Sequence, residues 1–208
     1  MTIETTIRRR RRQPDELRGE AIVAAKEILV VDGPAAVTLQ SVAKALGMTH
    51  GSITHHFGTA ANLQAAVADL LVEALLLEVR TGTTALKNGT ITERDLVDLV
   101  FDAFRDTGVA KLIAWLSAYQ SPLLRPLFDR FGRLSNEIAL DLESGSAFTE
   151  DELPEIIEGV VMPALSSALI GGELLGALGL DSSFTRERVA HDLSFRRAQR
   201  INGKGAGL

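Results

Sequence analysis

The chain has 208 residues, of which 46% are hydrophobic and 24% charged, and its formal net charge is −5. This length and apolar content suffice for a small domain plus a larger one, and they exclude an intrinsically disordered protein. The absence of cysteine excludes a disulfide framework and a thiolate metal site, and it fits a reducing compartment.

A basic segment near the amino terminus contains five consecutive arginines: Arg8, Arg9, Arg10, Arg11 and Arg12. The residues that follow, Gln13 to Glu16, are not a hydrophobic stretch, so we expect no secretory signal and a cytoplasmic protein. A run of like charges is usually a solvated tail, but it can also neutralise the phosphates of a nucleic acid. We predict a disordered basic arm over residues 1–14.

Residues 17–32 are predicted to form an amphipathic helix that ends at Asp32-Gly33-Pro34. After this break, residues 38–57 (TLQSVAKALGMTHGSITHHF) indicate two short helices joined by a glycine-containing turn, which is a helix-turn-helix. Thr38 and Thr49 are good N-caps, and Gly47 can adopt the left-handed conformation that ends a helix.

The second of these helices is only about two turns long. Met48, Ile53 and Phe57 can hold one side against the core. The residues left facing outward are small or polar: His50, Gly51, Ser52, Thr54 and His55. Such a face suits insertion into a DNA major groove, although periodicity alone also fits any small helical hairpin.

Thr59 can cap a further helix over about residues 60–80. With this helix in place, the sequence over roughly residues 15–75 resembles the tetracycline-repressor (TetR) family of bacterial transcriptional regulators. The resemblance is carried by these pairs and short motifs: Thr38-Leu39, Val42-Ala43, Leu46-Gly47, Gly51-Ser52-Ile53 and His55-His56-Phe57-Gly58. It implies a homodimer that binds an inverted-repeat operator in double-stranded DNA.

Matched residue by residue, the resemblance implies two sets of DNA contacts. The base-edge candidates are Gln40, His50, Gly51, Ser52 and Thr54, and the backbone-contact candidates are Thr38, His55 and His56. His56 is equally well explained as a half-buried packing residue. Gln40 is of interest because a glutamine can bridge N6 and N7 of an adenine.

The sequence departs from the family pattern at two positions that usually contact phosphate. Thr54 stands where the family often has a tyrosine, and Thr59-Ala60-Ala61 lacks the lysine usual there. The arginine run could replace these contacts along the backbone or in a minor groove. Residues 1–60 hold 8 Lys and Arg against 6 Asp and Glu, whereas residues 61–208 hold 14 against 21, so the basic side chains gather in the N-terminal part.

The C-terminal part is predicted to be helical throughout, which makes the fold class all-α: a three-helix DNA-binding domain over 15–80 and a helical effector-binding and dimerisation domain over 81–200. The pattern predicts helices near 93–106, 109–119, 123–143, 150–179 and 184–200, with a frayed tail over 201–208. The last two helices are the dimerisation candidates by resemblance.

The apolar stretch 160–180 could in principle span a membrane, but Pro163 and Glu173 within it favour a helix covered by protein, so we expect no membrane contact.

No enzymatic or metal site is expected. The four histidines include no His-x-x-x-His pair that would place two ligands on one helical face, and neither a nucleophile elbow nor a phosphate-binding loop occurs. We therefore expect no catalytic residues, no metal and no cofactor.

The function expected is that of a repressor released from DNA by a small apolar or aromatic effector. Large apolar and aromatic side chains on segments that surround the effector in the family are the candidate contacts: Phe101, Phe104, Trp115, Tyr119, Phe128 and Met162. For any one of these side chains, ordinary core packing is the favoured interpretation, because an apolar stripe at helical spacing is usually packing. The alternative function is an architectural or regulatory DNA-binding protein whose C-terminal domain binds a protein partner.

Overall fold

The computed structural model describes residues 14–140 and 150–205, and no strand occurs within these two ranges. This agrees with the predicted all-α class. The arginine run and the end of the helix predicted over 123–143 lie outside the described residues.

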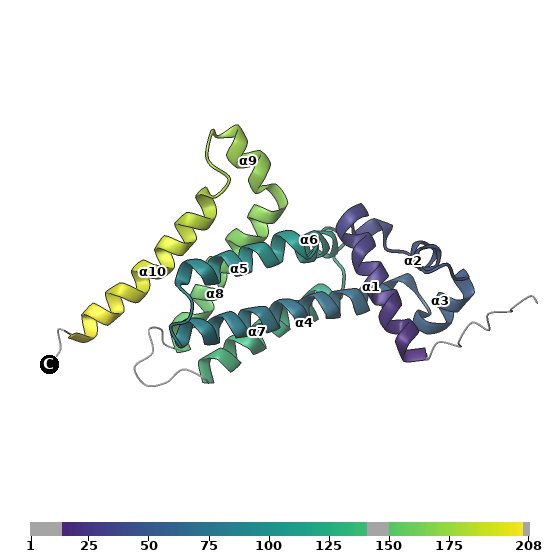
Figure 1. Cartoon of the computed structure of the whole chain (residues 1–208), viewed down its shortest axis with the longest axis horizontal. Coiled ribbons are helices and arrows are strands. Elements are labelled where there is room, and N and C mark those ends of the chain that lie inside the picture. Colours follow the sequence, from purple (N-terminus) through teal and green to yellow (C-terminus); the bar gives the residue numbers. More distant parts are fainter. Residues whose placement is uncertain (1–13, 141–149, 206–208) are drawn as a thin grey trace, which may run out of the picture.

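Four short elements form the N-terminal domain (Figure 1). Helix α1 (Pro14–Asp32) is followed by the 3-10 turn η1 (Pro34–Ala36), and then by α2 (Leu39–Ala45) and α3 (His50–Phe57). The side chains that join these helices in one core are small or medium-sized and fully enclosed: Ala21, Ala25, Val42 and Ile53. Small residues on α1 let the two short helices pack close to it.

Helix α4 (Ala60–Lys87) begins in the N-terminal domain and continues through the C-terminal domain (Figure 1). We expected this helix to end near Arg80, and that boundary was wrong by seven residues. The first residue after it with a left-handed conformation is Gly89, with φ 69°. Helical hydrogen bonding continues until that point because no stronger signal stops it.

Gly82 lies within this continuation, at the contact between α4 and α5 (Glu93–Asp106). A Cβ built on Gly82 would lie 2.8 Å from Cδ1 of Leu96, closer than real Cβ contacts. The glycine therefore allows α4 and α5 to approach each other closely. This packing offsets the roughly 1 kcal/mol that a glycine costs inside a helix.

The remaining helices pack around α4 and α5. Helix α6 (Val109–Ala118) matches its predicted position, and α7 (Leu124–Leu140) begins one residue after the predicted start at 123. The single helix predicted over 150–179 is instead a series of elements: η2 (Glu150–Glu152), α8 (Leu153–Ser166), a π-helical turn η3 (Ser167–Gly171) and α9 (Gly172–Ala177). The π turn widens the helix where it faces α5 and α6, so one regular helical period does not describe the segment.

Helix α10 (Phe184–Gly205) continues past residue 200, into the segment 201–208 that we predicted to be frayed. The helix that we predicted over 184–200 therefore ends five residues later than expected, since glycines weaken a helix without necessarily ending it. In Figure 1, α9 and α10 form an arm at the far end of the molecule from α2 and α3.

Two helical stretches, α4 and Leu153–Ala177, are long and apolar enough to cross a membrane by length and composition. Core helices of soluble proteins meet the same criterion, so this is weak evidence for a span. In α4, the buried residues from Leu63 to Leu75 belong to the core shared by both domains.

The loop before α6 contacts the end of α1. Gly108 has φ 83°, and a Cβ built on it would overlap Cδ2 of Leu29 and lie 3.1 Å from Cγ2 of Val30. The ammonium group of Lys111 donates a hydrogen bond to the Val30 carbonyl at 2.8 Å. This contact fixes the start of α6 against the last turn of α1, where helix carbonyls lack partners of their own.

Candidate DNA-binding site

Helices α2 and α3 are held at a fixed angle by the turn between them. The Thr38 hydroxyl accepts a hydrogen bond from the backbone N–H of Ser41, and the Thr49 hydroxyl accepts one from Ser52. Gly47, with φ 63°, supplies the left-handed residue at the end of α2. Both predicted caps and the predicted turn glycine are confirmed.

The two sides of α3 differ sharply in exposure. Ile53 and Phe57 are 0% and 3% exposed, so they anchor the helix in the core. His50, Gly51 and His55 are exposed, whereas Ser52, Thr54 and His56 are half-buried. The predicted outward face is therefore largely present, and it is presented at one end of the molecule (Figure 1).

Thr54 forms two contacts with His50, one turn earlier on α3. The Thr54 hydroxyl donates a hydrogen bond to the backbone carbonyl of His50 at 2.9 Å. Its oxygen also lies 3.3 Å from Nδ1 of the His50 ring. These contacts orient the imidazole at the amino-terminal end of α3, where reading helices present their base contacts.

Arg18 on α1 supports the opposite end of α3. Its guanidinium donates a hydrogen bond to the His56 carbonyl at 3.2 Å and lies 4.9 Å from the centre of the Phe57 ring. Sequence reasoning missed this contact, because Arg18 is 38 residues from His56 and carries no local signal. A positive charge at a helix carboxyl terminus also complements the helix dipole.

Thr38 and Gln40, at the start of α2, are both exposed. The Thr38 hydroxyl is already engaged by Ser41, whereas no hydrogen bond of the Gln40 side chain is found among the described residues. Gln40 therefore keeps its amide available for a base edge, and Thr38 acts first as a cap. Beyond α3, Asn62 donates to the Phe57 carbonyl at 2.8 Å and fixes the start of α4.

The candidate effector residues are distributed between core and surface. Phe101 and Phe104 are buried, and Trp115 is half-buried. Tyr119, Phe128 and Met162 are 71%, 43% and 54% exposed. The structure brings Trp115 and Tyr119 together, with ring centroids 5.3 Å apart, while Phe128 lies against Phe131.

A cavity of about 260 Å³ lies between α4 and α7, and none of these six side chains lines it. Its lining combines apolar residues with charged ones, among them Asp69, Arg130 and Arg133. Arg130 forms an ion pair with Asp69 at 3.0 Å across the two helices.

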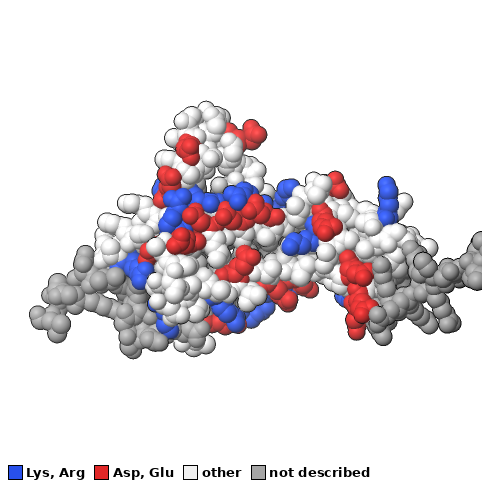
Figure 2. All heavy atoms as spheres, in the orientation of Figure 1, with Lys and Arg blue, Asp and Glu red and all other residues white. Residues whose placement is uncertain are grey.

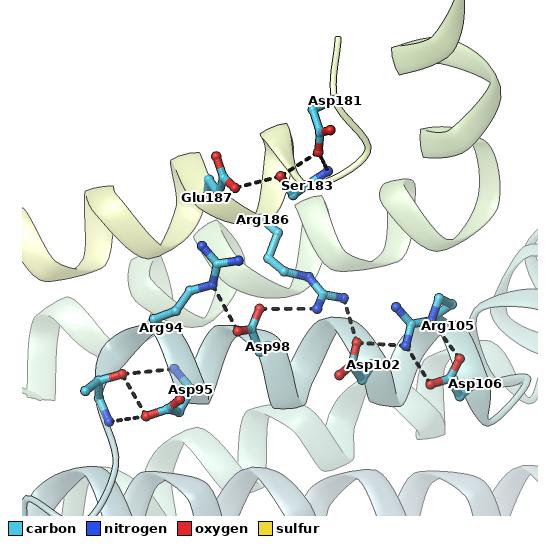
Figure 3. Close-up of polar contacts among 11 residues, drawn as sticks. Arg94, Asp95, Asp98, Asp102, Arg105, Asp106, Asp181, Ser183, Arg186 and Glu187 are labelled. Carbon is cyan, nitrogen blue, oxygen red and sulfur yellow. Dashed lines mark hydrogen bonds and ion pairs between the residues drawn. The ribbon is translucent and has the colours of Figure 1, made fainter.

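Acidic and basic side chains lie side by side on one face of the C-terminal domain (Figure 2). Ion pairs join six of them into a band of alternating charge: Arg94, Asp98, Arg186, Asp102, Arg105 and Asp106. Its centre is Arg186 of α10, which contacts Asp98 at 3.2 Å and Asp102 at 2.6 Å on α5 (Figure 3). Farther along the band, the hydrogen bond from Arg105 holds the pKa of Asp106 below its usual range. The band fixes α10 on α5. Among the described residues, no group of three or more His, Asp or Glu side chains is arranged to hold a metal ion.

The sequence from α1 to the start of α4 matches a known family model. Residues 21–67 match the model of the bacterial regulatory proteins of the tetR family. The N-terminal domain belongs to the TetR family. A TetR-family protein is a DNA-binding transcriptional regulator rather than an enzyme, so the helix-turn-helix described above is its DNA-binding element. A comparison with curated proteins found no significant match.

Solved structures extend the likeness to the whole chain. A putative TetR-family regulator from Mesorhizobium loti is similar with a TM-score of 0.68 and 14% identity, over 90% of this chain and 98% of the other. The multidrug binding protein EbrR, complexed with imidazole, has a TM-score of 0.57 and 21% identity over 84% and 93%. A TetR regulator from Streptomyces coelicolor has a TM-score of 0.52 and 18% identity over 88% and 96%. At these identities, the likeness shows that the C-terminal helices also share the TetR fold.

Proposed function

We propose that this TetR-family regulator is a cytoplasmic homodimeric repressor. It binds an inverted-repeat operator by inserting α3 of each copy into the major groove, and a small apolar or aromatic effector releases it. The observation that carries the DNA-binding part is the two-sided character of α3: Ile53 and Phe57 are enclosed while His50 and His55 are exposed. A helix anchored this firmly can present its polar face without distortion.

Dimerisation is assigned to the outer faces of α8, α9 and α10. These faces expose many large apolar side chains: Met162, Leu169, Ile170, Leu174, Leu178, Phe184 and Phe195. Large apolar side chains exposed along consecutive elements indicate a protein interface. A second copy is the occupant we propose, because the same helices from two subunits can form a four-helix bundle.

The effector site is assigned to the neighbourhood of Trp115 and Tyr119. Their rings form a tilted pair at 5.3 Å, which offers stacking surface together with one phenolic hydroxyl. EbrR, which shares the fold, is described as a multidrug binding protein and holds imidazole. By analogy, we expect a planar, mostly apolar compound at this position.

Selection of operator DNA tests the proposal. The full-length protein is incubated with a random duplex library, and the enriched sequences are expected to contain an inverted repeat that the protein protects on one face of the helix. Deletion of residues 1–12 should weaken binding to all sequences and flatten the dependence of affinity on salt. Failure to enrich any sequence would contradict the proposed function.

A compound screen tests the effector part. A bound aromatic compound should quench the fluorescence of Trp115 and lower operator affinity, and Tyr119→Phe should weaken this response while operator affinity without effector stays unchanged. If no compound changes fluorescence or DNA affinity, the alternative function gains support: the C-terminal domain binds a protein partner. The exposure of Tyr119 and Phe128, at 71% and 43%, favours that alternative.

A further inference from the structure

The Thr54 hydroxyl lies between two polar groups of His50. Its oxygen is 2.9 Å from the His50 carbonyl oxygen and 3.3 Å from Nδ1 of the ring. A hydroxyl has a single proton, and a carbonyl oxygen can only accept a hydrogen bond. The proton of Thr54 is therefore committed to the His50 carbonyl, as is common for threonine one turn later in a helix.

This arrangement determines the tautomer of the neutral His50 ring. Because the hydroxyl proton points to the carbonyl, the Thr54 oxygen can only accept from Nδ1, so Nδ1 carries the ring proton. A neutral imidazole has one N–H, and the other nitrogen is then an acceptor. Nε2 of His50, an exposed residue at the first position of α3, keeps a lone pair with no partner among the described residues.

We infer that His50 is a specificity-determining residue that reads an amino group in the major groove, and that Thr54 is its positioning residue. This inference rests on the proposed function. In the major groove, adenine offers its N6 amino group and cytosine its N4 amino group, whereas guanine and thymine offer oxygen acceptors. An unprotonated Nε2, which can only accept a hydrogen bond, therefore favours adenine or cytosine at one operator position and disfavours guanine or thymine.

Thr54 is thus assigned a role different from the base contact expected from the family resemblance. Its hydroxyl is engaged twice within α3, so it acts on the DNA through His50. His55 lacks this arrangement, since no hydrogen bond of its ring is found among the described residues; its ring lies 5.6 Å from that of His56 between centroids. The preference for a base with an amino group should therefore appear at the operator position that His50 contacts.

Nuclear magnetic resonance of the free full-length protein tests the tautomer. Long-range ¹H–¹⁵N spectra at mildly alkaline pH distinguish the two tautomers, and His50→Ala identifies the signals of His50. We expect the Nδ1–H form in the wild type and in Thr54→Ser, which keeps the hydroxyl. Thr54→Val, of nearly the same shape, should shift His50 toward the Nε2–H form. An Nε2–H ring in the wild type, or a ring unaffected by Thr54→Val, would overturn the inference.

Base analogues test the reading. In the selected operator, each adenine is replaced by purine and each cytosine by 2-pyrimidinone, which lack the amino groups. At one position, wild type and Thr54→Ser should lose affinity by roughly 3- to 10-fold, the value of one hydrogen bond. His50→Ala should bind the operators with and without this amino group equally well. Thr54→Val should prefer guanine or thymine at the same position.

The outcomes separate the two proposals. Failure of the wild type to select any operator contradicts the proposed function and this inference together. The inference alone is overturned if the wild type binds an operator tightly but no removal of a base amino group lowers its affinity in a way that depends on His50. A His50-dependent preference for guanine or thymine in the wild type does the same.

Discussion

Arg18 lies outside α3 but contacts its carboxyl-terminal end. We therefore expect it to affect how strongly the protein prefers operator DNA over random DNA. Arg18→Ala removes the hydrogen bond to the His56 carbonyl and the contact with the Phe57 ring. We expect a loss of about 1 kcal/mol in operator binding, with less effect on random DNA, because the carboxyl-terminal end of α3 is less firmly held. Fluorescence anisotropy with both DNAs measures the difference.

Arg18→Lys is the matched control, since it keeps the charge but not the planar group that lies on Phe57. Partial recovery of operator binding supports positioning. If Arg18→Ala instead weakens both DNAs equally and flattens the salt dependence, Arg18 is a phosphate contact.

Gln40 provides a second prediction at this scale. Its amide has no partner among the described residues, so Gln40→Ala should lower the preference at one base pair by about 1 to 3 kcal/mol while the fold is retained. Binding to a complete set of single-base operator variants measures this. Equal losses on every variant would assign Gln40 to the backbone.

The residue-scale predictions from sequence succeeded where the chemistry is local. The caps Thr38 and Thr49 and the turn glycine Gly47 follow from rules that span three or four residues. The pairing of Arg18 with the end of α3, and of Thr54 with His50, depends on side-chain direction or on distant segments. Spacing places Thr54 one turn after His50 but does not fix the direction of its hydroxyl. Arg18 is 38 residues from His56, so spacing says nothing about that contact.

At the scale of elements, the contact between α6 and α1 makes Gly108 sensitive to substitution. Gly108→Ala forces a side chain into a left-handed conformation and into the space of Leu29 and Val30. We expect a destabilisation of about 1 to 3 kcal/mol, measured by urea denaturation.

Gly132→Ala is the control. Gly132 lies within α7 with no atom near its added Cβ, so alanine there should stabilise the protein by up to about 1 kcal/mol. A Gly108→Ala variant as stable as the wild type would show that α6 shifts away from α1 at little cost.

The helix positions in the C-terminal domain were largely predictable, because glycines and N-caps separate the segments. The end of α4 and the π turn η3 were not. Gly82 lowers the helix propensity of this segment, and its close contact with Leu96, which offsets that cost, is not visible in the sequence. The extra residue of η3 is accommodated against α5 and α6, which a regular 3.6-residue period cannot represent.

At the scale of the whole molecule, the exposed apolar surface of α8 to α10 predicts a dimer. Leu174 is 51% exposed and Phe195 is 55% exposed. Leu174→Glu and Phe195→Glu should each raise the dimer dissociation constant about a hundredfold or more, because an unpaired charge would be buried at the interface. Sedimentation velocity measures this change, and operator affinity should fall with it.

Val31→Glu is the matched control, since Val31 is 78% exposed at the end of α1 in the other domain. It should leave the dimer intact. A wild-type protein that sediments as a monomer and binds a single half-site would contradict the dimer.

The continuous helix α4 has a mechanical consequence for the whole molecule. Its 28 residues at 1.5 Å each make a rod about 42 Å long, with the reading domain attached at one end. A tilt of about 5° around the far end displaces the reading domain by nearly 4 Å, more than the distance tolerance of a hydrogen bond. In a twofold-symmetric dimer the two displacements are opposite, so the spacing of the reading helices changes by up to twice that amount against a half-site separation of about 34 Å. Small angular changes deep in the C-terminal domain are thereby magnified into a mismatch of register along the DNA.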